Sequence, residues 1–154
     1  ISEFIWPTSP YPIDLGFWFY PIAIFLIIGS SNAVNLTDGM DGLAGLICAT
    51  AFAAYGIISL KEGQFFLGRF CFILVGALFG FLWFNVNPAM MFMGDTGSMF
   101  LGGMVVAISF SIGRPVLLIV MGGVYLLEAL SVMLQVAHYK RTKKRIFKIF
   151  EVFC

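Results

Sequence analysis

The stretch LAGLICATAFAAYGIISL, residues 43–60, contains no charged side chain. It is nearly as long as the ~20 residues that one helix needs to cross the hydrocarbon core of a bilayer. Four more apolar runs cover residues 15–34, 70–84, 99–112 and 116–137, and polar or turn-forming segments separate them. This pattern predicts five membrane-spanning helices.

The overall composition agrees with that prediction. Hydrophobic residues make up 60% of the 154 residues and charged residues 11%, whereas soluble domains average about 45–50% and about 25%. We therefore exclude an ordinary soluble protein and expect an all-α, polytopic integral membrane protein, with residues 1–154 forming a single membrane domain. The formal net charge of +1 excludes a nucleic-acid-binding protein with a globally basic surface.

The distribution of basic residues predicts the orientation in the membrane. Each span reverses the side, so the loops at 35–42 and 85–98 and the segment 138–154 share one face. That segment holds six basic residues: Lys140, Arg141, Lys143, Lys144, Arg145 and Lys148. The opposite face has only Lys61, Arg69 and Arg114. By the positive-inside rule, both loops face the cytoplasm and 138–154 is a basic cytoplasmic tail. The tail could also attract anionic lipid or a diphosphate substrate, but topology signalling explains it more simply.

The cysteines and the first residues say little about function. Cys48, Cys71 and Cys154 have no paired spacing, so neither a disulfide framework nor a zinc site follows. The chain begins with Ile1 and shows no signal-peptide pattern. We expect it to be a fragment of a longer protein.

The first polar loop contains two carboxylates three residues apart, Asp38 and Asp41. A helical backbone there would place both on one face. A charge deep in a bilayer costs at least about 2.5–3.5 kcal/mol, so two at the membrane edge suggest a polar cavity or a bound cation. The alternative, of similar weight on composition alone, is that both aspartates only cap the next helix.

The second polar loop contains the stretch GDTGS, residues 94–98, directly before an apolar run. Backbone N–H groups at the start of a helix attract phosphate. Asp95 would repel that phosphate unless a divalent cation lay between them, and oxygen ligands of this kind suit Mg²⁺. The two loops together suggest Mg²⁺-assisted phosphoryl chemistry. The alternative is that Asp95 serves as an ordinary helix cap.

Other candidates are weaker. Glu128 lies inside the fifth run, where an acid is a functional hypothesis by default, although hydrogen bonding between helices explains it equally well. Gln135 and the single histidine, His138, are near the membrane edge, where an interfacial role is the simpler interpretation. The Gly76-x-x-x-Gly80 spacing favours close helix packing.

Several segments together resemble the phospho-N-acetylmuramoyl-pentapeptide transferases, within the superfamily of polyprenyl-phosphate sugar-1-phosphate transferases. They occur in the family's order: NAVNLTDGMDGL at 32–43, FLWFN at 81–85, PA at 88–89, FMGDTGS at 92–98, LGG at 101–103, MGGV at 121–124, EALSV at 128–132 and LQV at 134–136. The resemblance extends from about residue 20 to residue 148.

This resemblance implies a ten-span enzyme of the bacterial inner membrane, of which this chain would supply the fifth to ninth spans. Such enzymes transfer phospho-N-acetylmuramoyl-pentapeptide from UDP-N-acetylmuramoyl-pentapeptide to undecaprenyl phosphate. The reaction needs Mg²⁺, releases UMP and gives lipid I for peptidoglycan synthesis, and so serves cell-wall biogenesis, cell shape and cell division. The resemblance also implies a homodimer.

The resemblance further implies roles for individual residues. Asp95 is the expected Mg²⁺ ligand, and Asp38 and Asp41 are expected to line the catalytic and nucleotide cleft with it. Asn35 supports them, and Phe92, beside Gly94, is expected to lie against the uracil. The secondary substrate-binding assignments are Asn32, Asn85, Ser98 and Gln135.

The chain also departs from the family. The family's Asp-Asp-x-x-Lys pattern has no counterpart here, and RIFK at 145–148 is followed by IFEVFC where the family has Met-Ala-Pro and a histidine triplet. A frameshift, a truncated gene or an incomplete sequence would explain the change. We expect negligible activity from these 154 residues alone.

A non-catalytic membrane module is the alternative function, either a fragment of an ion-coupled transporter or a remnant that only packs with other helices. Transporters often contain inverted repeats and broken helices near the bilayer midplane. Here the carboxylates cluster at one face and no repeat is visible, which favours the enzyme.

Overall fold

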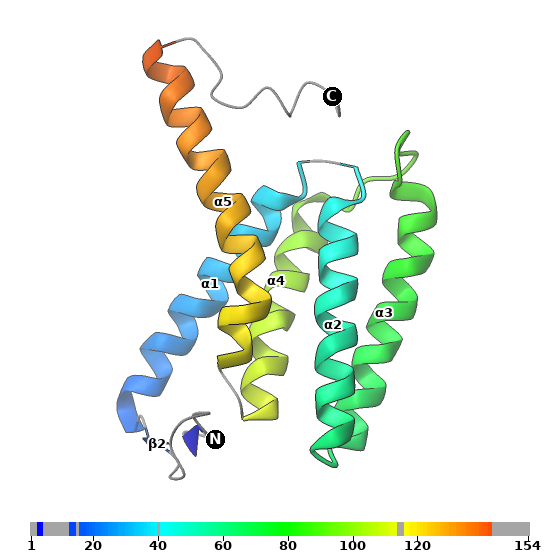
Figure 1. Ribbon diagram of the computed structural model, residues 1–154, viewed down its shortest axis with the longest axis vertical. Helices are drawn as coiled ribbons and strands as arrows, with labels where there is room; N and C mark the ends of the chain where they lie inside the picture. The colour runs from blue at the N-terminus through cyan, green and yellow to red at the C-terminus, as the bar shows by residue number, and fades with distance from the viewer. Residues whose placement is uncertain (1–2, 5–12, 15, 40, 114–115, 143–154) are drawn as a thin grey trace.

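The computed structural model describes residues 3–4, 13–14, 16–39, 41–113 and 116–142. These residues form five helices: α1 Phe19–Thr37, α2 Leu43–Lys61, α3 Phe65–Asn85, α4 Gly94–Ile112 and α5 Val116–Thr142. Two strands of two residues each, β1 Glu3–Phe4 and β2 Ile13–Asp14, pair antiparallel, and a 3-10 turn, η1 Gly16–Trp18, leads into α1. The expected all-α fold is confirmed (Figure 1).

Helices α3, α4 and α5 each extend five residues beyond one end of the predicted apolar run, and α1 extends three residues, to Thr37. Helix α3 begins at Phe65, and α4 begins at Gly94, so the stretch 94–98 forms the first turn of α4 instead of a loop before it. An acidic residue near the start of a helix is stabilised by the helix dipole, which explains why this polar stretch is helical. Helix α5 continues to Thr142, into the predicted tail, and residues 143–154 lie outside the described part.

Four of the described helical segments are long and apolar enough to cross a membrane: Gly16–Thr37, Leu43–Lys61, Phe65–Asn85 and Gly94–Ile112. The apolar stretch of α5, Leu117–Ser131, is shorter. A polytopic membrane protein is therefore confirmed, and the fifth crossing stays a prediction.

The helices run alternately up and down, so their connections collect at two ends. Residues 38–39, 41–42 and 86–93 lie at the same end as the last turns of α5, at the top of Figure 1. The short connection 62–64 and the end of α4 lie at the opposite end. The predicted grouping of the polar loops at one end is confirmed. Their cytoplasmic location stays a prediction.

Helices α1 and α4 pack closely because small residues face each other. A Cβ added to Gly102 would lie 2.5 Å from the backbone oxygen of Ser30 and 2.6 Å from the Cα of Ser31. The Ser30 hydroxyl donates to the Gly102 carbonyl at 2.9 Å. Small residues let two backbones approach closely in membrane proteins, where apolar burial alone does not hold helices together.

Glycines also shape the contact between α2 and α3. A Cβ at Gly68 would meet the Leu60 side chain at 2.7 Å, and one at Gly45 would meet Leu82 at 2.9 Å. In contrast, a Cβ at Gly76 or Gly80 would meet nothing within 4 Å, so this spacing packs against no described helix. The contact therefore depends on glycines other than the pair at 76 and 80.

Large apolar side chains cover much of the outer surface of the bundle. Phe25 on α1 is 75% exposed, and Ile73 and Phe79 on α3 are 69% and 57% exposed. A soluble protein rarely exposes continuous apolar surfaces of this kind. The exposed faces of α1 and α3 are suited to contact with lipid or with other membrane helices.

The crossing of α1 and α4 leads to a prediction about stability. Gly102→Ala forces the two backbones apart, and overpacking of this kind costs about 1–3 kcal/mol. We expect a lower midpoint of thermal unfolding in detergent, followed by intrinsic fluorescence.

Gly76→Ala is the matched control, because it makes the same change inside a helix where the new methyl group has open space. Equal midpoints for the two variants would contradict the close approach of α1 to α4.

Candidate functional site

The first loop at the shared end turns sharply between α1 and α2. Asp38 follows the last residue of α1, and its backbone N–H donates to the carbonyls of Val34 and Asn35 at 3.1 and 3.3 Å. The residue that caps the start of α2 is Gly42, with φ 75° and no side-chain capping bond. The alternative that Asp38 and Asp41 cap α2 is therefore wrong. The described residues between them form turns, so the helical arrangement considered for the pair is also wrong.

The start of α4 likewise shows no capping role for Asp95. Met93 occupies the capping position, no side chain makes a capping bond, and Asp95 lies in the first turn. Gly94 has φ 69°, a left-handed conformation that side chains rarely adopt. None of Asp38, Asp41 and Asp95 is used as an N-cap. Their carboxylates therefore remain available for other chemistry.

Asp38 and Asp95 interact although 57 positions separate them in the sequence. The half-buried position of Asp38 and, to a smaller extent, the negative charge of Asp95 raise the pKa of Asp38 above its ordinary value of 3.8. Burial and like charge both disfavour the ionised form of a carboxyl group. The fold therefore places Asp95 close enough for its charge to contribute to the raised pKa of Asp38.

Asn85 joins the two loops. Its side-chain oxygen accepts the backbone N–H of Gly42 at 2.9 Å, and its side-chain nitrogen donates to the carbonyl of Met91 at 2.7 Å. Asn85 is 3% exposed. Sequence reasoning missed Gly42 and Met91 as parts of the site, because both contribute backbone atoms. The dipeptides Asp38-Gly39 and Asp41-Gly42 were the signals in the sequence that a turn occurs here.

Two further bonds connect the loops and the helices that carry them. The buried Ser98 hydroxyl on α4 donates to the side-chain oxygen of Asn35 on α1 at 2.7 Å. The backbone N–H of Ala89 donates to the exposed carboxylate of Asp41 at 3.3 Å. Asn35, Asp41 and Ser98 thus lie within one network at the shared end of the bundle.

Of the remaining predicted site residues, Gly94 joins this network through its backbone carbonyl, which lies 3.2 Å from the Ser98 hydroxyl. Asn32 is exposed, and its amide donates to the carbonyl of Ile28 on its own helix at 2.8 Å. Phe92 is 74% exposed, and Gly94 is also exposed. Gln135 lies on α5, but its side chain and that of Glu128 are outside the described part.

The donor atoms at this end fit a hard divalent cation only in part. Among the described residues, no group of three or more histidine, cysteine or acidic side chains is arranged to hold a metal ion. Mg²⁺, however, usually binds one or two protein carboxylates and takes its other ligands from water and substrate phosphates. Asp95 and Asp38 are the carboxylates that would hold such an ion.

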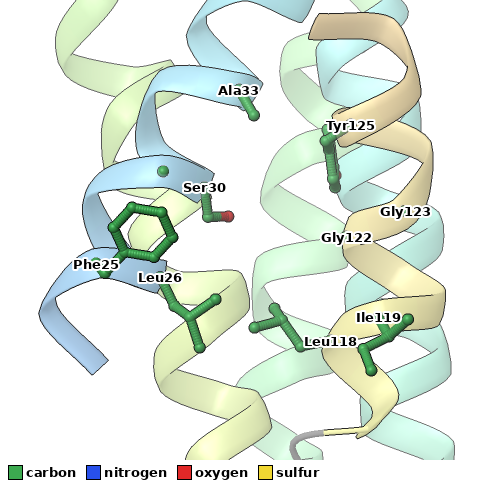
Figure 2. A pocket seen from close by; sticks show the side chains of 10 residues that line it. Phe25, Leu26, Ser30, Ala33, Leu118, Ile119, Gly122, Gly123 and Tyr125 are labelled. Atoms are coloured by element: carbon green, nitrogen blue, oxygen red, sulfur yellow. The ribbon is translucent and has the colours of Figure 1, made fainter. Parts of the chain in front are cut away.

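A separate cavity of about 390 Å³ lies between α1 and α5 (Figure 2). Its lining is mostly apolar, with Phe25 and Leu26 on one side and Leu118 and Ile119 on the other. No carboxylate lines it. The cavity suits an apolar group and is distinct from the carboxylate site.

A comparison with protein families gives the affiliation of the chain. Residues 2–113 match the model described as glycosyl transferase family 4. The chain belongs to glycosyl transferase family 4. The stretch matched includes α1 to α4 and therefore all three aspartates of the two loops.

Curated members of glycosyl transferase family 4 are similar over most of this chain. Two proteins named phospho-N-acetylmuramoyl-pentapeptide-transferase, from Bacillus thuringiensis (strain Al Hakam) and Bacillus cereus (strain AH187), are each 47% identical over 143 residues. The aligned part is 93% of this chain and 44% of each relative. The chain thus spans less than half the length of these relatives.

The environment of Asp38 leads to a prediction about pH. An acid whose pKa is raised by folding lowers the free energy of unfolding at any pH at which it is ionised. This destabilisation grows as the pH rises above 3.8 and vanishes well below that value. We expect Asp38→Asn to raise the thermal unfolding midpoint at neutral pH, with a gain that shrinks as the solution is acidified.

Asp41→Asn is the control, because it removes an exposed carboxylate from the same loop while keeping an oxygen that can accept from Ala89. The measurement is the unfolding midpoint against pH in detergent. The same rise in unfolding midpoint for both variants, or a rise that does not depend on pH, would argue against the environment described for Asp38.

Proposed function

We propose that this chain is part of an enzyme that transfers phospho-N-acetylmuramoyl-pentapeptide from its UDP carrier to undecaprenyl phosphate, giving lipid I and UMP. The observation that carries the proposal is that hydrogen bonds from Ser98 to Asn35 and from Ala89 to Asp41 hold the loop of Asp38 and Asp41 against the segment around Asp95. The 47% identity to two proteins named for this activity supports it. Because the chain covers 44% of those relatives, the activity is assigned to the longer protein.

In this proposal, Asp95 and Asp38 hold Mg²⁺ and Asp41 lines the same cleft. The ion, when bound, neutralises the negative charge of the diphosphate that is broken and of the lipid phosphate that attacks it. The carboxylates would otherwise repel both phosphates. The first turn of α4 adds backbone N–H groups and the positive end of the helix dipole, which favour phosphate binding near Asp95.

Recognition of the nucleotide is assigned to Phe92. A base can stack on an exposed aromatic ring, and Phe92 is 74% exposed two residues before Gly94, at the start of α4. Asn32, Gly94 and Gln135 are assigned to the substrate as well.

The lipid substrate and the membrane location complete the proposal. The cavity between α1 and α5 has the apolar lining that a polyprenyl chain requires, and its Ser30 hydroxyl is already bonded to Gly102. We assign the enzyme to the bacterial inner membrane, with the loops 38–42 and 86–93 and the basic tail from 138 onward in the cytoplasm, in a homodimer.

An ion transporter fits the described residues less well. The charged side chains of α1 to α4 are Lys61, Arg69 and Asp95, and each lies within about two turns of a helix end. A transport site is expected near the bilayer midplane. Helices α1 to α4 therefore favour chemistry at the membrane surface, whereas Glu128 lies inside α5.

The central experiment uses a chimera in which this chain replaces the 143 matching residues of the Bacillus thuringiensis relative. We expect Mg²⁺-dependent formation of lipid I in detergent, measured as UMP release and labelled lipid product. Asp95→Asn should lower the rate on the order of 10³-fold, since a metal ion supplies several kcal/mol of charge stabilisation.

Glu62→Gln is the control, because it neutralises a carboxylate at the opposite end of the bundle and should leave the rate unchanged. A folded chimera without transferase activity would refute the proposed function.

Phe92 gives a second prediction for the same site. Loss of stacking on one base costs about 1–3 kcal/mol, so Phe92→Ala should weaken UMP binding about tenfold in the presence of Mg²⁺. Isothermal titration of the chain in detergent measures the change.

Trp83→Ala serves as the comparison, because Trp83 is an 82% exposed aromatic residue on the outer side of α3. Equal losses for both variants would remove Phe92 from the nucleotide site.

A further inference from the structure

The side chain of Asn85 is buried at the shared end and forms hydrogen bonds through both its oxygen and its nitrogen. It is the last residue of α3 and 3% exposed. Its oxygen accepts one backbone N–H and its nitrogen donates to one backbone carbonyl. The two bonds use one of the two oxygen lone pairs and one of the two N–H groups of the amide, so both of its polar ends are engaged with the backbone.

The two backbone partners of Asn85 belong to different loops. Gly42 directly follows Asp41 and caps the start of α2. Met91 directly precedes Phe92 and lies three residues before the start of α4, which carries Asp95. A single side chain therefore connects the segment that holds Asp38 and Asp41 to the segment that leads into Asp95.

Only an amide side chain matches this pair of partners at this reach. A carboxylate would accept from Gly42 but face the Met91 carbonyl with a second acceptor, and an apolar residue would leave both backbone groups buried and unpaired. The other bond between the loops, from Ala89 to the exposed carboxylate of Asp41, is longer at 3.3 Å. Asn85 thus makes the shortest and most buried connection between the two loops.

We propose that Asn85 is a positioning residue, which fixes the Asp38–Asp41 loop against the segment that leads into Asp95. This role is in addition to the substrate-binding role expected from the resemblance. The proposal rests on the proposed function, because it concerns the spacing of the carboxylates that would hold Mg²⁺ and the nucleotide.

The test measures amide hydrogen exchange in the ligand-free chain, with ¹⁵N-glycine and ¹⁵N-methionine labels in detergent. Asn85→Ala should speed exchange of the Gly42 amide about tenfold or more, because its acceptor is lost, and should also speed exchange at Met90 and Met91. Those two amides donate to the carbonyl of Phe84 in the last turn of α3.

Asn85→Asp separates the two halves of the connection. It keeps the acceptor for Gly42 and loses the donor to Met91, so only the exchange at Met90 and Met91 should rise. Asn32→Ala is the matched control, because Asn32 is an exposed asparagine on α1 whose amide bonds only within its own helix. It should leave all three amides unchanged.

Titration with UMP and Mg²⁺ provides the second readout. If Asn85 positions the loops, Asn85→Ala should weaken UMP binding on the order of tenfold to a hundredfold, because a small displacement of the binding groups has an effect of this size. The exchange rates should also change before any ligand is added. Weaker binding with unchanged ligand-free exchange would instead make Asn85 a substrate ligand and overturn the proposal.

The outcomes stay interpretable if Asn85→Ala fails to fold, since faster exchange throughout the helices would reveal this. Asn85→Asp is then the deciding variant. Faster amide exchange confined to Met90 and Met91 supports the proposal, and unchanged exchange at both residues overturns it. If the unmodified chain and the chimera both fail to bind UMP, the proposed function fails, while the exchange experiment still reports on the connection between the loops.

Discussion

Every backbone N–H and carbonyl group within the hydrocarbon core of a bilayer must find its partner inside the protein, and the architecture follows from this constraint. The chain meets it with apolar helices whose polar connections lie at the two ends. Ionised side chains are costly between those ends. The residues suited to phosphoryl chemistry are therefore confined to the segments around 38–42 and 86–98.

The two loops at this end also need a fixed position relative to each other. Helix packing performs part of this task, since the approach of Gly102 to Ser30 fixes α4 against α1 and thereby brings Ser98 to Asn35. The side chain of Asn85 adds the connection between the loop after α1 and the loop after α3. Hydrogen bonds that are shielded from water specify geometry more strongly than exposed ones.

The same arrangement has an energetic cost. Asp38 is half-buried and feels the negative charge of Asp95, so the folded chain holds an acid in an environment that disfavours its ionised form. Sites that bind cations and phosphates commonly store unfavourable charge of this kind until the ligand arrives. The packed helices, in which Val34, Phe52 and Val105 are fully buried, supply the stability that offsets it.

The sequence by itself determined the fold class, the helix order and the segments that carry the chemistry, because apolar runs of membrane length and their polar interruptions are local features. It predicted the start of α4 too late, since the first turn is polar and was interpreted as a loop. It also left open whether Asp38, Asp41 and Asp95 were caps, and the structure places Gly42 and Met93 in those positions. Only the tertiary structure decided that Asp38 lies near Asp95 and that Asn85 connects two backbones, because these contacts join residues far apart in the chain through helix packing.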